Sequence, residues 1–106
     1  MEKLEGPYEI LELEDEQTLT TKISHWAIGE VLIHPAYKPD GKFIKALRIH
    51  VPEADKEYFP FYWDATSQTL IAQLLPYLEQ PGYAQRTYTI TKHGVAPRAR
   101  FTLIVK

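Results

Sequence analysis

One short stretch of this chain has the periodicity of a helix, and the remainder consists of β-type runs separated by turn residues. Residues 66–75 are expected to form that helix, because apolar residues recur there and just beyond it at the spacing of a buried stripe. That stripe consists of Leu70, Ile71, Leu74, Leu75 and Leu78. Pro76 lacks an amide hydrogen and is expected to kink or end the helix. The pattern predicts a mainly-β α+β fold with one helix, arranged as a small barrel, a sandwich or a curled antiparallel sheet.

The N-terminal third of the chain is expected to supply three strands. Residues 8–13 alternate in polarity and carry glutamates, which is typical of an edge strand. Residues 18–33 are rich in Thr, Ile, Val and Trp, and Gly29 is expected to mark a bulge or bend between two strands.

The sequence Pro-Asp-Gly at residues 39–41 predicts a turn, because proline fixes φ and glycine tolerates the left-handed conformation. The runs on either side, residues 31–37 and 43–51, should therefore pair as a hairpin. Alternation in the second run predicts one face for the core and one that carries bases. The expected core face holds Phe43, Lys45, Leu47, Ile49 and Val51, and the other holds Lys42, Ile44, Ala46, Arg48 and His50.

The C-terminal half begins with a dense aromatic run at residues 58–63, which Pro60 restricts to an edge or irregular strand. Residues 86–92 and 98–105 are expected to form a final hairpin, joined by residues 93–97. Its last strand is predicted to place apolar and basic side chains on opposite faces. The apolar face holds Ala99, Phe101, Leu103 and Val105, and the other holds Arg98, Arg100 and Thr102.

A length of 106 residues predicts a single domain, in which residues 1–7 form an acidic and flexible N-terminus. The chain has no cysteine, which excludes disulfides and thiolate metal sites. It shows neither the basic and apolar start of a signal peptide nor a run of about 18 apolar residues. We therefore expect a cytoplasmic protein that does not associate with membranes.

The net charge of −2 conceals an uneven distribution of charge along the chain. Residues 1–16 hold seven acids and one base, whereas residues 82–106 hold five bases and no acid. Residues 38–48 add four bases against one acid, Asp40. If the basic segments fold together, the domain has one positive face suited to a polyanion. The plainer alternative is a solvated surface with uneven charge.

Catalytic and metal-binding motifs are not found in the sequence. Ser24 and His25 are adjacent and are expected to point to opposite faces of a strand, so they do not form a nucleophile–base pair. The four histidines lack the paired spacing of a metal site. We expect no catalysis, no metal, no cofactor and no small-molecule substrate, which leaves a small hydrolase or nuclease as the least favoured alternative.

Binding of single-stranded nucleic acid requires cations along the phosphates and flat rings for base stacking. Both residue types occur close together in this chain. The alternatives are core packing for the rings and weak surface ion pairs for the cations. The candidate binding residues are Trp26, Tyr37, Lys42, Lys45, Arg48, Tyr62, Arg86, Tyr88, Lys92, Arg98 and Arg100.

Residues 86–105 resemble the terminal hairpin of small single-stranded-DNA-binding proteins of phages and prokaryotes. In that family an Ile-Thr-Arg strand runs into a glycine turn, which is followed by Thr-Arg-Tyr. Here the corresponding residues are Ile90-Thr91-Lys92, Gly94 and Arg100-Phe101, and Ala99 replaces the threonine. The resemblance covers about a fifth of the chain, and the metal-binding cysteines of some members have no counterpart. It implies a barrel of the oligonucleotide-binding type.

The function expected from these observations is non-catalytic binding of single-stranded DNA, or of RNA, on a basic and aromatic sheet face. Exposed strand edges would also permit a homodimer. The acidic residues 9–16 would either compete with phosphate for the basic face or recruit a basic partner. The alternative function is that of a protein-interaction or regulatory module that docks through residues 58–63.

Overall fold

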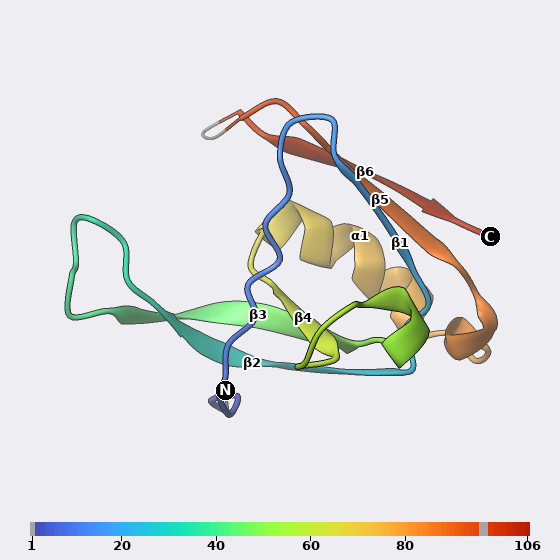
Figure 1. Ribbon diagram of the computed structural model, residues 1–106, viewed down its shortest axis with the longest axis horizontal. Coiled ribbons are helices and arrows are strands. Elements are labelled where there is room, and N and C mark those ends of the chain that lie inside the picture. The colour runs from blue at the N-terminus through green and yellow to red at the C-terminus, as the bar shows by residue number, and fades with distance from the viewer. Residues whose placement is uncertain (1, 96–97) are drawn as a thin grey trace.

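The computed structural model describes residues 2–95 and 98–106 and contains two three-stranded antiparallel sheets and one α-helix (Figure 1). In chain order the elements are β1 Thr18–Thr21, β2 His25–Ile33, β3 Lys42–His50, the 3-10 turn η1 Glu53–Asp55, β4 Tyr62–Ala65, α1 Gln68–Leu78, the 3-10 turn η2 Tyr83–Gln85, β5 Tyr88–His93 and β6 Arg100–Val105. The expected mainly-β fold with one helix is confirmed. The pairing of the described strands gives two sheets and no closed barrel.

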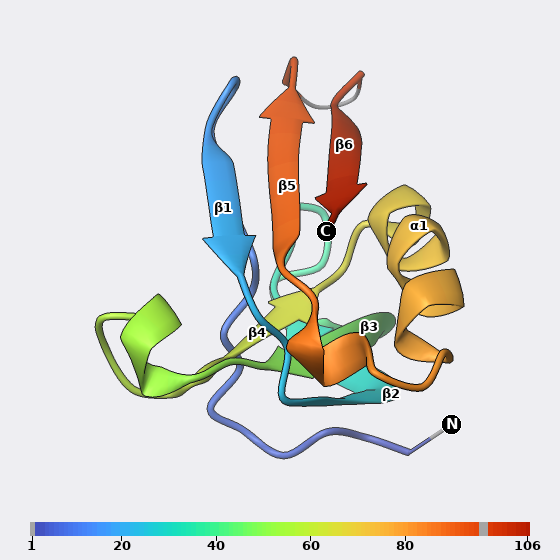
Figure 2. The same ribbon diagram turned by 90° about the vertical axis from the view of Figure 1, so that its right-hand side faces the viewer.

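The two sheets, β1-β5-β6 and β2-β3-β4, form a wedge with α1 between them (Figures 1 and 2). Only residues 22–24 separate β1 from β2, so one continuous stretch of chain passes from one sheet to the other. The amide of Ser24 donates to the carbonyl of His50 at 2.8 Å and continues the ladder between β2 and β3. Ile23 is completely buried at this corner. The corner closes one end of the wedge, and the opposite end stays open.

The hairpin between β2 and β3 is confirmed, and its turn has the expected chemistry. Gly41 has a φ of +93°, and its amide donates to the carbonyl of Lys38 at 2.9 Å. The expected bend at Gly29 is wrong, because the chain bends at residues 22–24 and Gly29 lies within a regular part of β2. A Cβ atom at Gly29 would lie 2.7 Å from the carbonyl oxygen of Glu2. This glycine therefore allows another segment to approach the backbone closely.

Helix α1 begins after Ser67, whose hydroxyl accepts a hydrogen bond from the amide of Leu70 at 3.4 Å. Its buried residues are Leu70, Ile71, Leu74 and Leu78, as the periodicity predicted, whereas Leu75 of the predicted stripe is only half-buried. Pro76 was expected to kink or end the helix. It does not end the helix, because α1 continues to Leu78. Burial of Leu78 in the core offsets the one backbone hydrogen bond that a proline removes.

Residues 2–14, which we call the N-terminal strap, wrap around the sheet β2-β3-β4. Near its start, Leu4 donates to the carbonyl of Glu30 at 2.8 Å on the edge of β2. Further along, Leu11 donates to the carbonyl of Asp64 at 2.9 Å on the edge of β4. Both contacts are parallel bridges, so one segment covers the two edges of the sheet and crosses its outer face, which points away from α1.

One expectation for this N-terminal region differs from the structure. The strand expected at residues 8–13 is wrong, because only an isolated bridge at Ile10 forms there. The flexibility expected of residues 1–7 stays a prediction; within them residues 2–4 lie along β2, and residue 1 is outside the described part. The strap pairs with the sheet only at isolated bridges and forms no regular strand, because it leaves the edge of β2 to reach the edge of β4.

The core fills the wedge and draws on both sheets and the helix. Leu47 and Ile49 of β3 point into it, as the alternation predicted, but Phe43 of the same predicted face is exposed because β3 extends beyond the core at its start. The opposite face of β3 is also covered, because Ala46 and Arg48 are buried there. Within residues 2–95 and 98–106, no helix is long and apolar enough to cross a membrane.

We predict that Gly29→Ala loosens the strap, because the added methyl group would overlap the backbone of Glu2 and the side chain of Leu4 at 2.7 Å. Overpacking of this kind lowers the free energy of unfolding by about 1–3 kcal/mol. Urea unfolding measures that loss, and the amide of Leu4 should exchange with solvent faster. The control is Gly6→Ala, whose nearest neighbour would be at 3.9 Å. Equal stability of the two variants would contradict the close packing of the strap.

Candidate nucleic-acid interface

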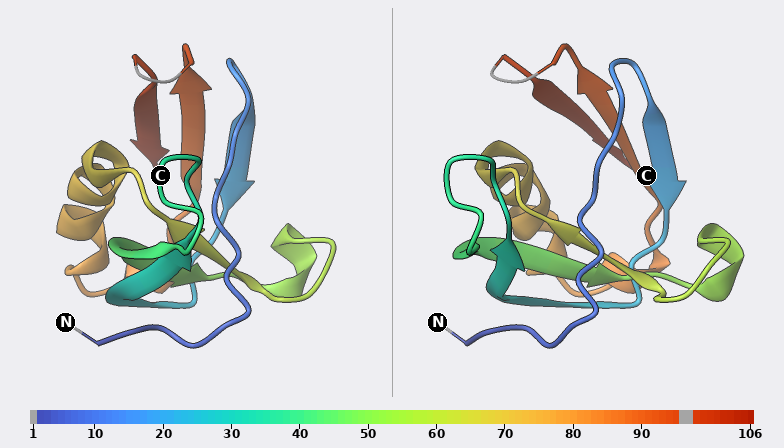
Figure 3. Two further views of the ribbon diagram at one scale, coloured as in Figure 1. Left: turned by 90° about the vertical axis from the view of Figure 1, so that its left-hand side faces the viewer. Right: turned by 60° about the vertical axis from the view of Figure 1, so that its left-hand side comes forward.

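The hairpin β2–β3 and the hairpin β5–β6 point toward the same open end of the wedge (Figures 1 and 3). Lys42 begins β3 beside the first tip. Lys92 lies near the end of β5, and Arg100 begins β6. Topology therefore brings cations from the two predicted segments to one end of the molecule. Residues 96 and 97 of the second connection lie outside the described residues.

Two adjoining cavities of about 470 and 520 Å³ form a groove at this open end. They share three lining residues, namely Ile10, Glu12 and Thr66. The first cavity extends along the hairpin β2–β3 to His34 and Ile44, and the second reaches Lys92 and Phe101. The groove thus runs beside the strap, from one hairpin to the other.

Exposed rings with cations above them lie on the hairpin β2–β3. Tyr37 is 74% exposed, and the Nζ atom of Lys42 lies 5.1 Å from the centre of its ring. On the neighbouring strand, Phe43 is exposed, and the Nζ atom of Lys3 lies 4.1 Å from its ring centre. A flat exposed ring beside a cation offers a base a stacking surface and its phosphate a charge.

The expected cations divide between different faces at the open end. Lys42 shares a face of β3 with Ile44 in the groove, whereas Lys45 alternates to the opposite face. In the other sheet Lys92 lines the groove, and it lies opposite Phe101 in the ladder. The exposed residues Arg98 and Arg100 lie at the rim. Lys92 is thus the cation that lines the groove, while the other cations lie on the two hairpins that flank it, namely Lys42, Lys45, Arg98 and Arg100.

The assignment of Arg48 to phosphate binding is wrong, because the guanidinium is buried in an ion pair. Its Nε donates to Asp64 at 2.7 Å, and its Nη2 donates to the second carboxylate oxygen at 3.1 Å. Burial disfavours the charge of Arg48, but the hydrogen bonds and attraction of Asp64 outweigh burial and raise its pKa. Arg48 also lies 4.0 Å above the ring of Tyr62. Its charge is compensated inside the fold and is not available to a ligand.

The assignment of Tyr88 to base stacking is also wrong. Tyr88 is 0% exposed, and its hydroxyl donates to the carbonyl of Tyr83 at 3.0 Å. It shares the core face of β5 with Ile90, so alternation along the strand turns the ring inward.

Two other candidates also lie away from the groove. Trp26 is half-buried against the core, and its Nε1 donates to the carbonyl of Leu78 at 3.1 Å. Arg86 precedes β5 at the end far from the open groove, where it lies 5.6 Å from the ring of Tyr77. Neither side chain joins the cations at the open end.

A row of rings that the composition did not reveal crosses the outer face of β2-β3-β4. His25 and His50 stack with ring centres 3.8 Å apart and planes at 14°, and Tyr62 follows at 5.4 Å from His50. Burial, the charge of His25 and the charge of Arg48 lower the pKa of His50, in that order. The sequence could have predicted this stack of histidines. In the hairpin, the register that pairs Ile33 with Lys42 across the predicted turn also pairs His25 with His50.

The expectation that Ser24 and His25 point apart is wrong. The Ser24 Oγ lies 3.4 Å from the Nδ1 of His25, because Ser24 precedes the regular part of β2. The same hydroxyl donates to the carbonyl of His50 at 3.2 Å, and the ring of His25 is stacked on that of His50. These contacts tie the pair to the adjacent strand.

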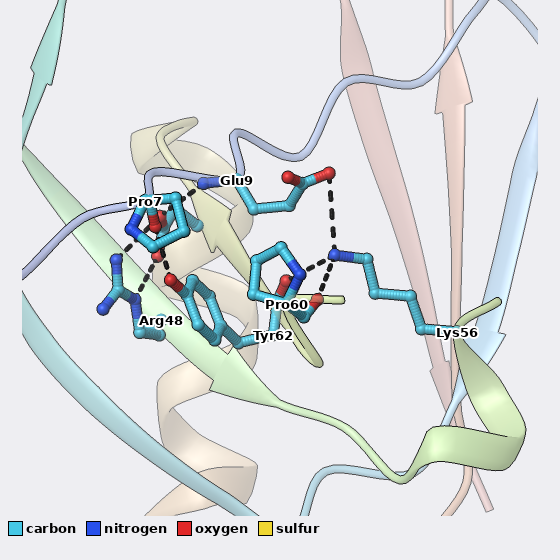
Figure 4. Close-up of polar contacts among 7 residues, drawn as sticks. Pro7, Glu9, Arg48, Lys56, Pro60 and Tyr62 are labelled. Carbon is cyan, nitrogen blue, oxygen red and sulfur yellow. Dashed lines mark hydrogen bonds and ion pairs between the residues drawn. The ribbon is translucent and has the colours of Figure 1, made fainter. Parts of the chain in front are cut away.

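The strap is anchored beside this row of rings (Figure 4). The hydroxyl of Tyr62 donates to the carbonyl of Pro7. Lys56 is buried, and its Nζ lies 3.5 Å from the carboxylate of Glu9 and donates to the carbonyls of Pro60 and Tyr62. These contacts close the outer face at the strap crossing.

The aromatic segment 58–63 divides between internal contacts and exposure. The hydroxyl of Tyr58 donates to Glu9 at 3.1 Å, and Trp63 lies 4.1 Å from the Nζ of Lys56. Phe59 is 73% exposed and meets Phe61 edge to face. The segment therefore offers two exposed rings, Phe59 and the 54% exposed Tyr58, while Phe61 and Trp63 are partly buried.

Comparison with protein-family models, curated proteins and solved structures gives no match to this chain. Among the residues that the structure describes, no group of three or more His, Cys, Asp or Glu side chains is arranged to hold a metal ion.

We predict that Asp64→Ala lowers the free energy of unfolding by about 3–5 kcal/mol, because it leaves Arg48 buried without its partner. Urea unfolding measures this loss, and Asp40→Ala in the exposed turn is the control. Replacement of both Arg48 and Asp64 by leucine should lower the free energy of unfolding less than Asp64→Ala alone, since it removes both charges together. A loss below about 0.5 kcal/mol for Asp64→Ala would contradict the role of the pair.

We predict that His50 titrates below the ordinary histidine pKa of about 6.5 in the folded protein. The unfolded chain takes up this proton first as the pH falls, so acidification below about pH 6.5 destabilises the fold. NMR titration of the imidazole resonances measures the pKa directly. His25→Gln should raise the pKa of His50 part of the way back, since it removes one of the two charges that lower it. An unchanged pKa in that variant would contradict the coupling.

Proposed function

We propose that this protein binds single-stranded nucleic acid without catalysis, at the groove between the hairpins β2–β3 and β5–β6. The observation that carries the proposal is the groove itself, which has Lys92 in its lining and reaches the hairpin that carries Tyr37 and Lys42. Stacking on exposed rings and contact between phosphates and cations are the two interactions that such binding requires. We propose single-stranded DNA as the preferred ligand on the resemblance of the C-terminal hairpin, and the cytoplasm as its location.

The order of the strands supports the proposal. If β1 and β2 are counted as one bent strand, five strands remain, and α1 lies between the third and the fourth. The bent strand pairs with both β3 and β5, as in the partly open barrel of the oligonucleotide-binding type. In that architecture the loops between strands 1 and 2 and between strands 4 and 5 flank the ligand. Here they correspond to the two hairpin connections at the groove.

Each residue in the proposed site has a distinct role. Tyr37 stacks on a base, and Lys42 and Lys92 hold phosphates along the groove. Lys45, Arg98 and Arg100 attract the strand from the rim, where charge raises the rate of encounter. Arg48, Arg86, Tyr88 and Trp26 are left out of this set because their side chains are buried or lie elsewhere.

The acidic strap competes with phosphate in this proposal. Glu12 lines both cavities, and Glu14 lines the cavity that holds Lys92. Asp15 accepts a hydrogen bond from the amide of Gly94 at 2.7 Å, beside the tip of the second hairpin. Carboxylates in these positions repel a polyanion and weaken its binding.

The proposal predicts that affinity for oligothymidine falls steeply with salt. Fluorescence anisotropy of a labelled oligothymidine between 50 and 200 mM NaCl measures the slope of log affinity against log salt. Each phosphate contact contributes about −0.7 to that slope, so Lys42→Ala with Lys92→Ala should reduce its magnitude by about 1.4. Lys22→Ala, at the closed end of the wedge, is the matched control. Absence of binding at 50 mM NaCl, or an equal effect of the control, would refute the site.

The stacking role predicts that Tyr37→Ala weakens oligothymidine binding by about 1–3 kcal/mol, with little change in the salt slope. Phe59→Ala is the matched control, because this ring is equally exposed but distant from the groove in sequence and fold. Equal losses of oligothymidine affinity in the two variants would contradict a defined stacking site at Tyr37.

A second candidate function is protein docking through Phe59, which is favoured by the exposure of this ring and its contact with Phe61. Binding through an aromatic protein interface depends far less on salt than binding to phosphates does. If Phe59→Ala abolishes a salt-insensitive interaction with a protein while oligothymidine does not bind, the second candidate replaces the first.

A further inference from the structure

Strand β6 has a free backbone edge over its C-terminal half. Lys106 and Thr87 exchange both backbone hydrogen bonds at 3.0 Å, so Ile104, Thr102 and Arg100 also form hydrogen-bonded pairs with β5. The alternation turns the amides and carbonyls of Phe101, Leu103 and Val105 away from β5. Within the described residues, no backbone group pairs with this edge at Leu103 or Val105.

A groove of about 420 Å³ runs beside this edge, between β6 and α1. Leu103 contributes from the strand. The helix side of the groove is lined by Ala72, Gln73, Pro76, Tyr77 and Gln80.

One helix side chain already uses the β6 edge. The Nε2 of Gln73 donates to the carbonyl of Phe101 at 3.0 Å. The outward carbonyls of β6 are therefore within reach of a donor that approaches from the helix side. The next outward groups along the strand, at Leu103 and Val105, remain available to a ligand.

The surroundings of the β6 edge are basic in its C-terminal half, whereas acids of the N-terminal segment approach β6 near Phe101 and Thr102. Residues 82–106 contain no acid, and Arg100 and Lys106 lie at the two ends of β6 with exposed side chains. Arg86 lies over Tyr77, which lines the groove. The nearest acid in sequence is Glu79, at the end of α1. Between the two ends of β6, Ile104 is 50% exposed on the solvent face of the strand.

We propose that β6 binds an acidic, extended peptide segment of a partner protein as an additional strand of the sheet β1-β5-β6. Leu103 and Val105 supply the backbone hydrogen bonds that hold such a strand. Apolar side chains on one face of the peptide enter the groove beside α1, and acidic side chains on the other face lie near Arg100 and Lys106. A peptide in which acidic and apolar residues alternate fits both the apolar groove and the basic residues, because successive side chains of a strand point to opposite faces.

Charge distinguishes this partner from a second copy of the chain. Antiparallel pairing of two β6 strands would bring the basic ends of one edge to the basic ends of the other, and like charges directly opposite each other are destabilising. An acidic peptide instead compensates these charges. The backbone contacts of the peptide lie in the half of β6 remote from the nucleic-acid groove, and Arg100 is the one residue that the two proposed sites share. The peptide site therefore does not depend on the proposed function.

The test uses a short synthetic, end-capped peptide in which glutamate alternates with valine, added to the isotope-labelled full chain. The amides of Leu103 and Val105 should shift in NMR spectra and exchange more slowly with solvent, since they become hydrogen-bonded. A peptide with lysine in place of each glutamate should bind at least tenfold more weakly. Shifts centred outside β6 and α1, or equal binding of the lysine peptide, would overturn the proposal.

Ala72→Trp should weaken the glutamate peptide at least tenfold, because the indole fills the groove from an exposed position of α1. Ala54→Trp in the exposed turn η1 is the matched control. Oligothymidine affinity is measured on the same samples, so failure of the peptide site and failure of the nucleic-acid site are separate outcomes. Protection of Leu103 that rises with protein concentration without peptide would assign the edge to a second copy and overturn the proposal.

Discussion

The carboxylate of Asp64 connects three parts of the fold that are distant in sequence. It lies on β4, receives two hydrogen bonds from Arg48 on β3, and accepts a third from the amide of Glu9 in the strap at 3.0 Å. The backbone of Asp64 adds hydrogen bonds to Glu9 and Leu11. A fully buried carboxylate needs this number of donors, because an unpaired charge in the interior costs several kcal/mol. The crossing of the strap is therefore fixed by the same group that neutralises Arg48.

This connection also determines which surfaces remain open to ligands. The strap covers the outer face of β2-β3-β4 near Tyr62 and both edges of that sheet. Three kinds of surface stay accessible: the groove at the open end of the wedge, the rings at its rim, and the edge of β6 beside α1. The first two carry charge and aromatic surface suited to nucleic acid, and the third carries backbone groups suited to a strand. The two proposed ligands therefore use different surfaces of one small fold.

Local patterns predicted the elements well, whereas burial on the outer face required knowledge of the tertiary structure. The turn at Gly41 and the leucine stripe of α1 follow from rules that act over a few residues. Arg48 was placed on an exposed basic face because alternation separates two faces but does not reveal that a distant segment covers one of them. Tyr88 illustrates the opposite case, since alternation alone places it on the same face of β5 as Ile90 and so predicts its burial. The groove arises from the strap and both hairpins together, so no single window of sequence contains it.

The strap also has a consequence for the order of events when the chain is made. Its residues leave the ribosome before the edge positions that hold them, Glu30 and Asp64. Similarly, β1 must wait for β5, because Thr18 pairs with Thr91. Contacts between such distant positions slow folding, since a long loop closes before they form. Until the strap docks, the sheet β2-β3-β4 therefore has two uncovered edges.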